Sequence, residues 1–268
     1  YFNYILVFHM SQNNELNKIS NSLVKAFLRN KTIKPIPEKF CKNINLANNL
    51  RLLCEKKINK PVIGFKAGGT VIAMLKTLKE KEPFYSSIYK QNFLKSGQKV
   101  KIDKYTLGIE LEVSYLVKKS FFSSKGKITM KNISKHISHM APCIEVVGYR
   151  QSKKGVKYLG DLSSDFGANK KFVLGTKKKF KKINFGNLKT NIQNKKVGQS
   201  VNGHSNTVYI NPLNALRFVL NKLRKDKVNL NKDFYVFTGS TVGVVPIKGK
   251  GLYTGRIDKL GSVKAIIH

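Results

Sequence analysis

The sequence predicts an α+β fold, in which a small helical region precedes a domain built mostly of strands. Two observations support this prediction. In the opening part of the chain, apolar residues recur at helical spacing, whereas after about residue 100 most of them alternate with polar residues or form short apolar runs. One strong helix interrupts the later strands. We therefore expect a helical region at residues 10–60 and a β-rich domain at residues 61–268.

The composition excludes several classes of protein. The chain has 268 residues, of which 41% are hydrophobic and 10% aromatic, enough for a packed core and too many for a disordered tail, a collagen-like fibre or a disulfide-stapled miniprotein. Three scattered cysteines, Cys41, Cys54 and Cys143, are typical of reduced thiols in a cytoplasmic protein. No apolar run approaches the roughly 20 residues that span a bilayer, so we expect no membrane partner.

The net charge of +37 comes from 51 Lys and Arg against 14 Asp and Glu. Most of it is lysine, whereas proteins that read nucleic acids favour arginine for bidentate contacts. The densest basic run, residues 177–182, looks like a solvated turn, and no zinc-finger, RNP or P-loop spacing is present. We expect no specific nucleic-acid partner. Polyanion binding stays open as an alternative, supported by net charge alone.

The first elements are helices. Tyr1 to His9 lacks the features of a signal peptide, and Met10 followed by polar residues resembles a start, so we expect the first nine residues to be translated upstream sequence. Apolar residues then recur from Leu16 to Phe27 and predict a helix that ends near Asn30. After two prolines, a second helix places four residues on one face: Leu46, Leu50, Leu53 and Cys54.

Short elements follow in order. Residues 62–65 predict a buried strand, Gly68 and Gly69 a turn, and residues 71–78 a helix. Alternation predicts strands at 109–113 and 144–146, and further strands are expected at 172–174, 183–185, 234–237, 252–257 and 263–267. The interrupting helix has Asn211 as its N-cap and Pro212 at its first position, and its apolar stripe consists of Leu213, Leu216, Leu220 and Leu223.

The few carboxylates carry chemical information. Glu110 and Glu112 lie two apart on a predicted strand and project from the same face, and Glu145 has the corresponding place in a second strand. Clustered carboxylates repel one another unless a proton or a cation intervenes, and a hard divalent ion such as Mg²⁺ or Mn²⁺ prefers oxygen ligands. A solvated strand face, paired with the plentiful lysines, explains the same spacing.

A second candidate for metal binding is weaker. His136 and His139 are three apart on a predicted helix, with Ile133 and Ile137 facing inward. Because no Cys or Asp completes the set, we favour a solvent-facing pair over a metal site.

Several co-linear motifs resemble the 2-keto-4-pentenoate hydratase and 4-oxalocrotonate decarboxylase family of the fumarylacetoacetate hydrolase superfamily. Residues 63–70 (IGFKAGGT) resemble its Gly-Lys-Gly-Thr signature, residues 110–112 (ELE) its E-x-E strand, and residues 142–150 (PCIEVVGYR) its P-A-x-E-(I/V)-V-D-S-R segment. The block at residues 161–175, and the segments NPLNA at 211–215, TGS at 238–240 and LGSV at 260–263, continue the match to the C-terminus.

The resemblance implies a mixed β-roll domain with Mg²⁺ or Mn²⁺ held by Glu110, Glu112 and Glu145. It also implies that Lys66 orients the substrate or relays a proton, with a pKa lowered by burial near the cation. Taken without the glycine motif around it, Lys66 is one more surface lysine. The substrate-binding residues implied by the same match are Arg150, Asp165 and Ser240, with pairing to the metal carboxylates as the alternative role of Arg150.

The sequence departs from the family pattern at three places. Gly148 and Tyr149 replace Asp-Ser, residues 166–168 (Phe166, Gly167 and Ala168) replace Asn-Ala-Ser, and Lys81 stands where an Asp is usual. These changes are expected around the pocket, where they bear on the choice of substrate and on the level of activity.

The resemblance therefore implies a divalent-metal-dependent hydratase that adds water to a small 2-hydroxydienoate or 2-oxo-enoic acid, such as 2-keto-4-pentenoate, in aromatic meta-cleavage catabolism. The alternatives are a decarboxylase of the 4-oxalocrotonate type, a catalytically degenerate family member, and a basic polyanion-binding protein. A homo-oligomer in the cytoplasm is expected from the same resemblance.

Overall fold

The computed structural model describes residues 2–153 and 155–268, and side chains from residue 14 onward except residue 154. The side chains of Tyr1 to His9 lie outside the described part of the chain. The expectation that these residues are translated upstream sequence therefore stays a prediction. Helices and strands occur in the order expected for the α+β class, with helices first and strands predominating after residue 60, and this fold class is confirmed.

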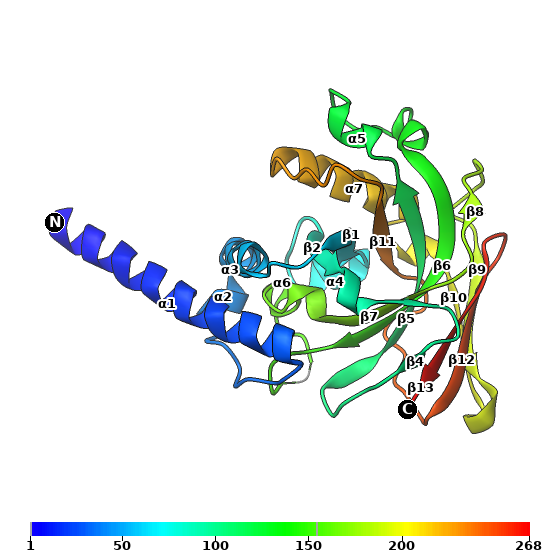
Figure 1. The fold of residues 1–268 in the computed structure, drawn as a ribbon, viewed down its shortest axis with the longest axis horizontal. Coiled ribbons are helices and arrows are strands. Elements are labelled where there is room, and N and C mark those ends of the chain that lie inside the picture. Colours follow the sequence, from blue (N-terminus) through cyan, green and yellow to red (C-terminus); the bar gives the residue numbers. More distant parts are fainter. Residues whose placement is uncertain (1, 154) are drawn as a thin grey trace.

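The N-terminal region contains α1 (Phe2–Arg29), α2 (Lys39–Lys42) and α3 (Ile44–Lys57) (Figure 1). The side chain of Asn43 caps α3 by accepting hydrogen bonds from the backbone N–H groups of Asn45 and Leu46. Apolar residues of these helices form a buried cluster that also contains Tyr89 and Phe166. The helical region thus packs on later parts of the chain, and a domain boundary at residue 60 stays a prediction.

Two sheets form most of the remaining structure. The first has the order β2-β1-β11-β5-β6-β7-β3, with β8 paired to β6, and the second the order β10-β9-β12-β13-β4. The strands of the first sheet are β1 (Val62–Gly68), β2 (Phe84–Tyr89), β3 (Phe93–Lys95), β5 (Thr106–Val117), β6 (Ile137–Gly148), β7 (Asn169–Leu174), β8 (Lys178–Lys179) and β11 (Phe234–Ser240). Those of the second are β4 (Lys99–Val100), β9 (Lys189–Asn194), β10 (Gln199–His204), β12 (Gly251–Ile257) and β13 (Gly261–Ile267).

The later helices are α4 (Ile72–Thr77), α5 (Ser120–Ser123), α6 (Leu159–Ser163) and α7 (Pro212–Lys225). Five short 3₁₀ segments connect other elements: η1 (Lys90–Asn92), η2 (Ile133–His136), η3 (Phe166–Ala168), η4 (Lys195–Val197) and η5 (Ser205–Thr207). Asn211 caps α7 as predicted, since its side chain accepts from the N–H of Leu213. No described helix is long and apolar enough to cross a membrane.

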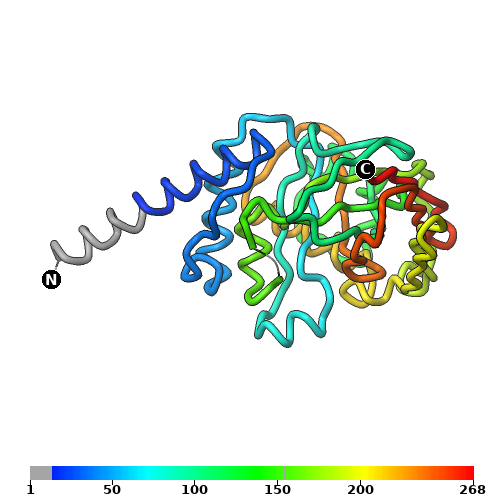
Figure 2. The backbone as a smooth tube through the Cα atoms, turned by 90° about the horizontal axis from the view of Figure 1, so that it is seen from below, coloured from blue at the N-terminus to red at the C-terminus, as the bar shows by residue number. Residues whose placement is uncertain are grey.

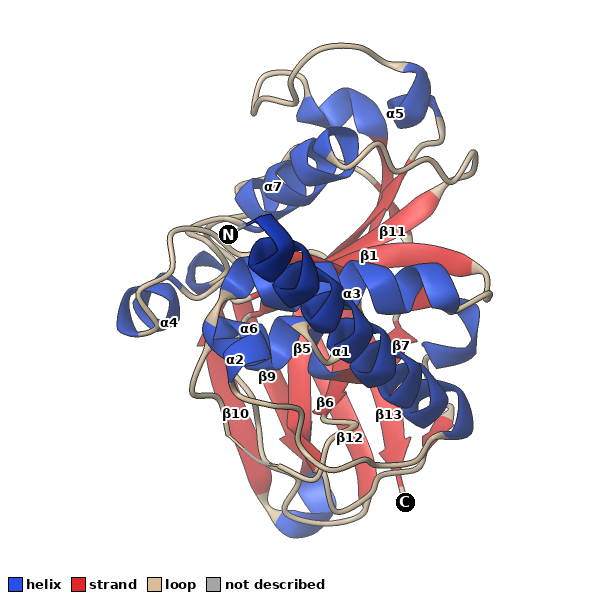
Figure 3. Cartoon of the chain, turned by 90° about the vertical axis from the view of Figure 1, so that its left-hand side faces the viewer, coloured by secondary structure: helices blue, strands red, loops and turns tan. Residues whose placement is uncertain are grey.

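The main core lies between the two sheets and under α7. Ile109, Leu111 and Val113 of β5 are fully buried in it, and β5 confirms the strand predicted at 109–113. The buried stripe of α7 joins the same cluster. In Figure 2 the N-terminal helices lie at one end of the molecule and the C-terminal strands at the other, and Figure 3 shows α1, α2, α3 and α6 together in front of the strands.

Two local predictions for residues 177–185 are wrong. Residues 183–185 form a loop, because Ile183 and Phe185 pack their side chains against the core without joining a ladder. Within the predicted turn at 177–182, Lys178 and Lys179 form β8 opposite His139 and Met140, although their side chains are exposed.

The two histidines do not share a helix. His136 ends η2, with its ring edge-on to Phe121 at 5.7 Å, whereas His139 lies in β6. The shared helix predicted for them is therefore wrong, and both side chains are half-buried. Within the described residues, the group of three metal-ligating side chains consists of glutamates elsewhere.

Candidate metal centre and active site

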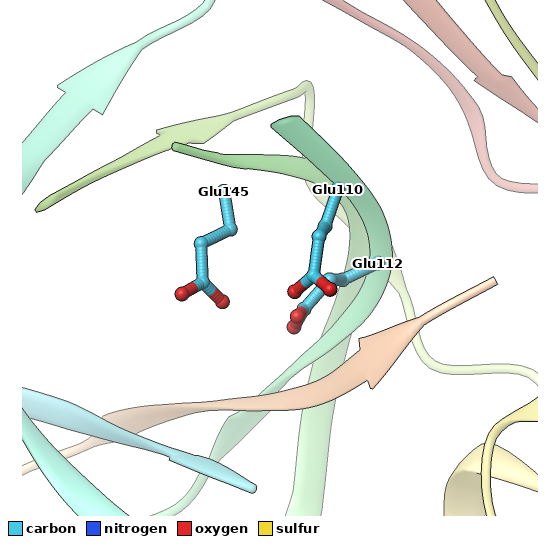
Figure 4. Close-up of side chains that lie close together, drawn as sticks. All are labelled: Glu110, Glu112 and Glu145. Atoms are coloured by element: carbon cyan, nitrogen blue, oxygen red, sulfur yellow. The ribbon is translucent and has the colours of Figure 1, made fainter. Parts of the chain in front are cut away.

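Strands β5 and β6 bring three glutamates together. The two strands run antiparallel, with Glu110 directly opposite Glu145 and Glu112 opposite Cys143. One carboxylate oxygen from each of Glu110, Glu112 and Glu145 lies within 4.8 Å of the others. In Figure 4 the three side chains extend toward a common region from the two neighbouring strands.

These carboxylates do not form a solvated strand face. Glu112 and Glu145 are completely buried, and Glu110 is half-buried. Glu112 Oε2 accepts a hydrogen bond from the backbone N–H of Gly239 at 3.1 Å, and Glu145 Oε1 accepts one from Lys66 Nζ at 2.5 Å. The other oxygens, Glu112 Oε1 and Glu145 Oε2, have no hydrogen-bond partner among the described residues. A buried carboxylate oxygen without a hydrogen-bond partner costs desolvation free energy, so a partner for these two oxygens is expected in the working protein.

The electrostatics of the cluster indicate what that partner is. Burial and the neighbouring Glu145 raise the pKa of Glu110 to about 7, and the same causes raise the pKa of Glu112 well above its ordinary value. Burial also raises the pKa of Glu145, although Lys66 opposes the shift. Within this buried cluster one lysine faces three carboxylates. The arrangement fits a hard divalent cation, which takes oxygen ligands and removes the repulsion.

Lys66 lies on β1, with its ammonium group between two acceptors. Its Nζ donates to Glu145 Oε1 and to the carbonyl oxygen of Gly167, the latter at 3.2 Å. Burial lowers the pKa of Lys66, but attraction to Glu145, Glu110 and Glu112 outweighs burial, so the pKa is above its ordinary value. The lowering expected beside a bound cation stays a prediction, because this shift is that of the protein without metal.

Arg150 and Asp165 pair with each other. Arg150 Nη1 lies 3.3 Å from Asp165 Oδ1, and the backbone N–H of Arg150 donates to both oxygens of that carboxylate. The guanidinium stacks near the rings of Phe27 and Phe166, at 4.8 and 5.1 Å. Neither Arg150 nor Asp165 is among the described residues that line the cavity next to Glu110. The two side chains thus form a buried pair, and the substrate contact expected for them stays a prediction.

A cavity of about 440 Å³ lies next to the carboxylates. Lys66 and Glu110 are the charged side chains among its described lining residues. The backbone around Gly68, Gly69, Gly167 and Gly239 forms part of its wall, with Thr70, Thr77 and Ser240 as polar side chains. The rest of the lining is apolar: Ala67, Val71, Met74, Leu78, Phe84, Leu107, Val147, Val156, Leu162 and Val244.

Ser240 lies at this cavity, as expected for a substrate-binding residue. Its hydroxyl donates to the carbonyl oxygen of Gly243 at 2.8 Å and accepts from the N–H of Val242, so it also closes a tight turn. Gly239 beside it has φ of +102°, and a Cβ there would meet Thr70 Oγ1 at 2.0 Å. Sequence reasoning gave Gly239 and Thr70 no role, although both lie inside motifs that carry the resemblance.

The residues that depart from the family pattern were expected around the pocket, but most of them do not line the cavity. Phe166 points into the N-terminal cluster and contacts Phe27 at 5.0 Å. Gly148 allows close approach of the Tyr105 carbonyl, and Lys81 is exposed. Of the replaced residues, Gly167 lines the cavity.

Comparison with known proteins bears on the fold. No protein-family model matches the sequence. TodF product hydratase of Pseudomonas putida F1 is 23% identical over 206 residues, which cover 76% of this chain and 75% of that protein. The structure of 4-oxalocrotonate decarboxylase from Pseudomonas putida G7, complexed with magnesium and adipate, superposes with a TM-score of 0.80 at 19% identity, over 96% of this chain and 98% of that one.

A more distant structure has the same general architecture. Fumarylpyruvate hydrolase from Pseudomonas aeruginosa, in complex with Mn²⁺ and pyruvate, matches with a TM-score of 0.51 at 14% identity, over 77% of this chain and 89% of that one. The chain therefore has the fold of the fumarylacetoacetate hydrolase superfamily, and its resemblance to the hydratase and decarboxylase family of that superfamily is confirmed.

Proposed function

We propose that the protein is a divalent-metal-dependent hydratase that adds water to a small 2-hydroxydienoate or 2-oxo-enoic acid, such as 2-keto-4-pentenoate. The observation that carries this proposal is the buried cluster of Glu110, Glu112 and Glu145, which includes two unpartnered carboxylate oxygens and meets an apolar cavity through Glu110 and Lys66. The similarity to a hydratase and to a metal-bound decarboxylase supports it. As part of the same proposal, the enzyme would act in the meta-cleavage breakdown of aromatic compounds.

Glu110, Glu112 and Glu145 would hold Mg²⁺ or Mn²⁺. When bound, the ion supplies Lewis-acid stabilisation of the negative charge that develops on the oxygens of a 2-oxo acid. Glu112 and Glu145 are fixed by the Gly239 N–H and by Lys66, while Glu110 is the ligand that lines the cavity. The two buried ligands are thus preorganised, and the third faces the incoming substrate.

Lys66 would bind and orient the acid. Its Nζ is fixed by Glu145 Oε1 and by the Gly167 carbonyl at the edge of the cavity, from where it can donate to a substrate oxygen or pass a proton to it. The Gly167 carbonyl and Glu145 occupy two of its three donor positions, which leaves one for the substrate. The apolar walls keep water away from the rest of the substrate, so that water enters only where the conjugated alkene accepts it.

The cavity lining favours the hydratase over the decarboxylase reading. 4-Oxalocrotonate is a dicarboxylate, and its second carboxylate would need a cation or several N–H donors when buried. Beyond Lys66, no positively charged side chain is among the described lining residues, and most of the wall is aliphatic. A monocarboxylate with an apolar tail fits this surface.

A cytoplasmic location and a homo-oligomer are part of the same proposal. The three cysteines Cys41, Cys54 and Cys143 are free and buried, which agrees with a reducing compartment. The oligomer rests on the resemblance alone.

The test is the turnover of 2-hydroxypenta-2,4-dienoate with Mg²⁺ or Mn²⁺, and with chelator, alongside 4-oxalocrotonate. We expect metal-dependent loss of the dienol that is absent in Glu112→Gln and retained in Glu15→Gln, a surface control whose carboxylate pairs with Lys39. Faster decarboxylation of 4-oxalocrotonate would overturn the hydratase assignment. Metal binding without turnover of either acid would indicate a degenerate family member.

A further inference from the structure

The backbone next to Lys66 has an unusual conformation. The three residues of η3, Phe166, Gly167 and Ala168, have positive φ angles of 55°, 77° and 52°. This left-handed region suits glycine and disfavours residues with a Cβ, so Phe166 and Ala168 are strained. All three residues are buried. Strain of this kind persists where the surroundings hold it, and it clusters at functional sites.

Arg150 holds both ends of this turn. One guanidinium nitrogen donates to Asp165 Oδ1 at 3.3 Å, just before the turn, and the other donates to the carbonyl oxygen of Asn169 at 2.5 Å, just after it. The backbone N–H of Arg150 adds two further bonds to the Asp165 carboxylate. The planar fork of an arginine suits such a bridge, which a single lysine ammonium would not reproduce.

A residue of the N-terminal helix completes the support. Phe27 of α1 lies 4.8 Å from the Arg150 guanidinium and 5.0 Å from the Phe166 ring, and Phe166 lies 5.1 Å from the guanidinium. The three side chains are buried and form one cluster. Because the family pattern has Asn where this chain has Phe166, the aromatic contact between α1 and the turn is a feature of this sequence.

The turn ends at the proposed active site. The carbonyl oxygen of Gly167 accepts from Lys66 Nζ at 3.2 Å, and Gly167 itself lines the cavity. We propose that Arg150 and Phe27 are positioning residues, which clamp the left-handed turn at 166–168 so that its carbonyl aims the Lys66 ammonium at the substrate. The inference rests on the proposed function for its catalytic consequence. It gives the N-terminal helix a role in catalysis although none of its described residues lines the cavity.

The experiment compares Phe27→Leu and Arg150→Lys with Leu23→Ala. Leu23 lies one turn before Phe27 in the same hydrophobic cluster on α1 and is fully buried, but it is not a partner in the aromatic and hydrogen-bond contacts named above, so its truncation measures the effect of weakened helix packing. For each variant, kcat, KM, Mg²⁺ affinity and thermal unfolding are measured. The rate at which acetic anhydride acylates Lys66 is followed by peptide mapping, which requires no turnover.

We expect Phe27→Leu and Arg150→Lys to lower kcat by at least roughly tenfold, because a misplacement of about an ångström is enough for that. KM and Mg²⁺ affinity should stay within about twofold, and acylation of Lys66 should accelerate, while Leu23→Ala leaves both kcat and acylation near wild type. Equal losses in all three variants, in proportion to lost stability, would overturn the proposal, as would unchanged acylation of Lys66. If the wild type turns over neither test acid, the proposed function fails, and the acylation rates still decide whether the clamp holds Lys66.

Discussion

Lys66 Nζ lies 2.5 Å from Glu145 Oε1, and both side chains are buried. They come from strands 79 residues apart in sequence, β1 and β6, which are not neighbours in the sheet. A single buried ion pair of this kind leaves two more carboxylates, Glu110 and Glu112, without a countercharge of their own. The pair is therefore best understood as one part of a charge arrangement that a divalent cation completes.

Removal of one buried carboxylate should separate metal binding from folding. The raised pKa of Glu112 means that its ionised form destabilises the metal-free protein at neutral pH. Without metal, we expect Glu112→Gln to be more stable to unfolding than the wild type, by about 1 kcal/mol or more. We also expect the variant to lack the rise in Tm that Mg²⁺ gives the wild type. Thermal unfolding with and without Mg²⁺ checks this. A full Mg²⁺ shift in the variant would show that Glu112 is not a ligand.

Replacement of Lys66 should affect catalysis more than metal binding. Lys66→Met removes the countercharge of Glu145 and the donor to the substrate, so we expect kcat to fall by about 10²–10⁴-fold. Because the three carboxylates remain and lose a competing cation, Mg²⁺ should bind at least as tightly as in the wild type. Isothermal titration of Mg²⁺ beside steady-state kinetics makes the comparison. Lys25→Met serves as the control, since Lys25 is exposed on α1.

Gly239 should tolerate no side chain. Gly239 has a φ of +102°, and a Cβ added there would lie 2.0 Å from Thr70 Oγ1. We therefore expect Gly239→Ala to move the backbone N–H that donates a hydrogen bond to Glu112 Oε2. We expect a loss of about 2 kcal/mol or more in the free energy of unfolding and weaker Mg²⁺ binding. Gly243→Ala is the matched control: its φ is +72°, but no atom of the described residues lies within 4 Å of the added Cβ. It should cost about 1 kcal/mol of strain and leave Mg²⁺ affinity unchanged.

Asp161 should make stability depend on acid pH. Burial raises the pKa of Asp161, but hydrogen bonds from Lys153 and from the N–H groups of Tyr158 and Lys157 outweigh burial and lower it below 3.8. A lowered pKa gives stability that is present above the unfolded-state pKa and lost as pH falls through the folded-state value. We expect Asp161→Asn to cost about 1–2 kcal/mol at pH 7.

Urea unfolding at several pH values measures that difference. The gap between wild type and Asp161→Asn should shrink as pH drops below about 3.8, where the wild-type carboxylate takes up its proton. A gap that stays constant down to pH 2 would assign the effect to something other than this charge.

The sequence predicted the elements whose own pattern determines them. The helix cap at Asn211 and the alternation around Glu110 were found because capping and strand periodicity are local. Strands β9 and β10 were missed, since their residues are mostly polar and their position depends on pairing with each other and with β12. The segment at 183–185 was mistaken for a strand because Phe185 is buried by packing against Tyr115, at 5.4 Å, without a ladder.

By itself, the sequence determined the α+β class, the shared face of Glu110 and Glu112, and the motifs that resemble a metal-dependent family. These follow from spacing along one strand, which fixes the direction of side chains. Only the tertiary structure decided that the carboxylates are buried, that Lys66 meets Glu145, and that Arg150 lies under the turn instead of in the cavity. Burial and pairing across distant strands depend on register and packing, and these arise when the sheet closes and the N-terminal helices cover it.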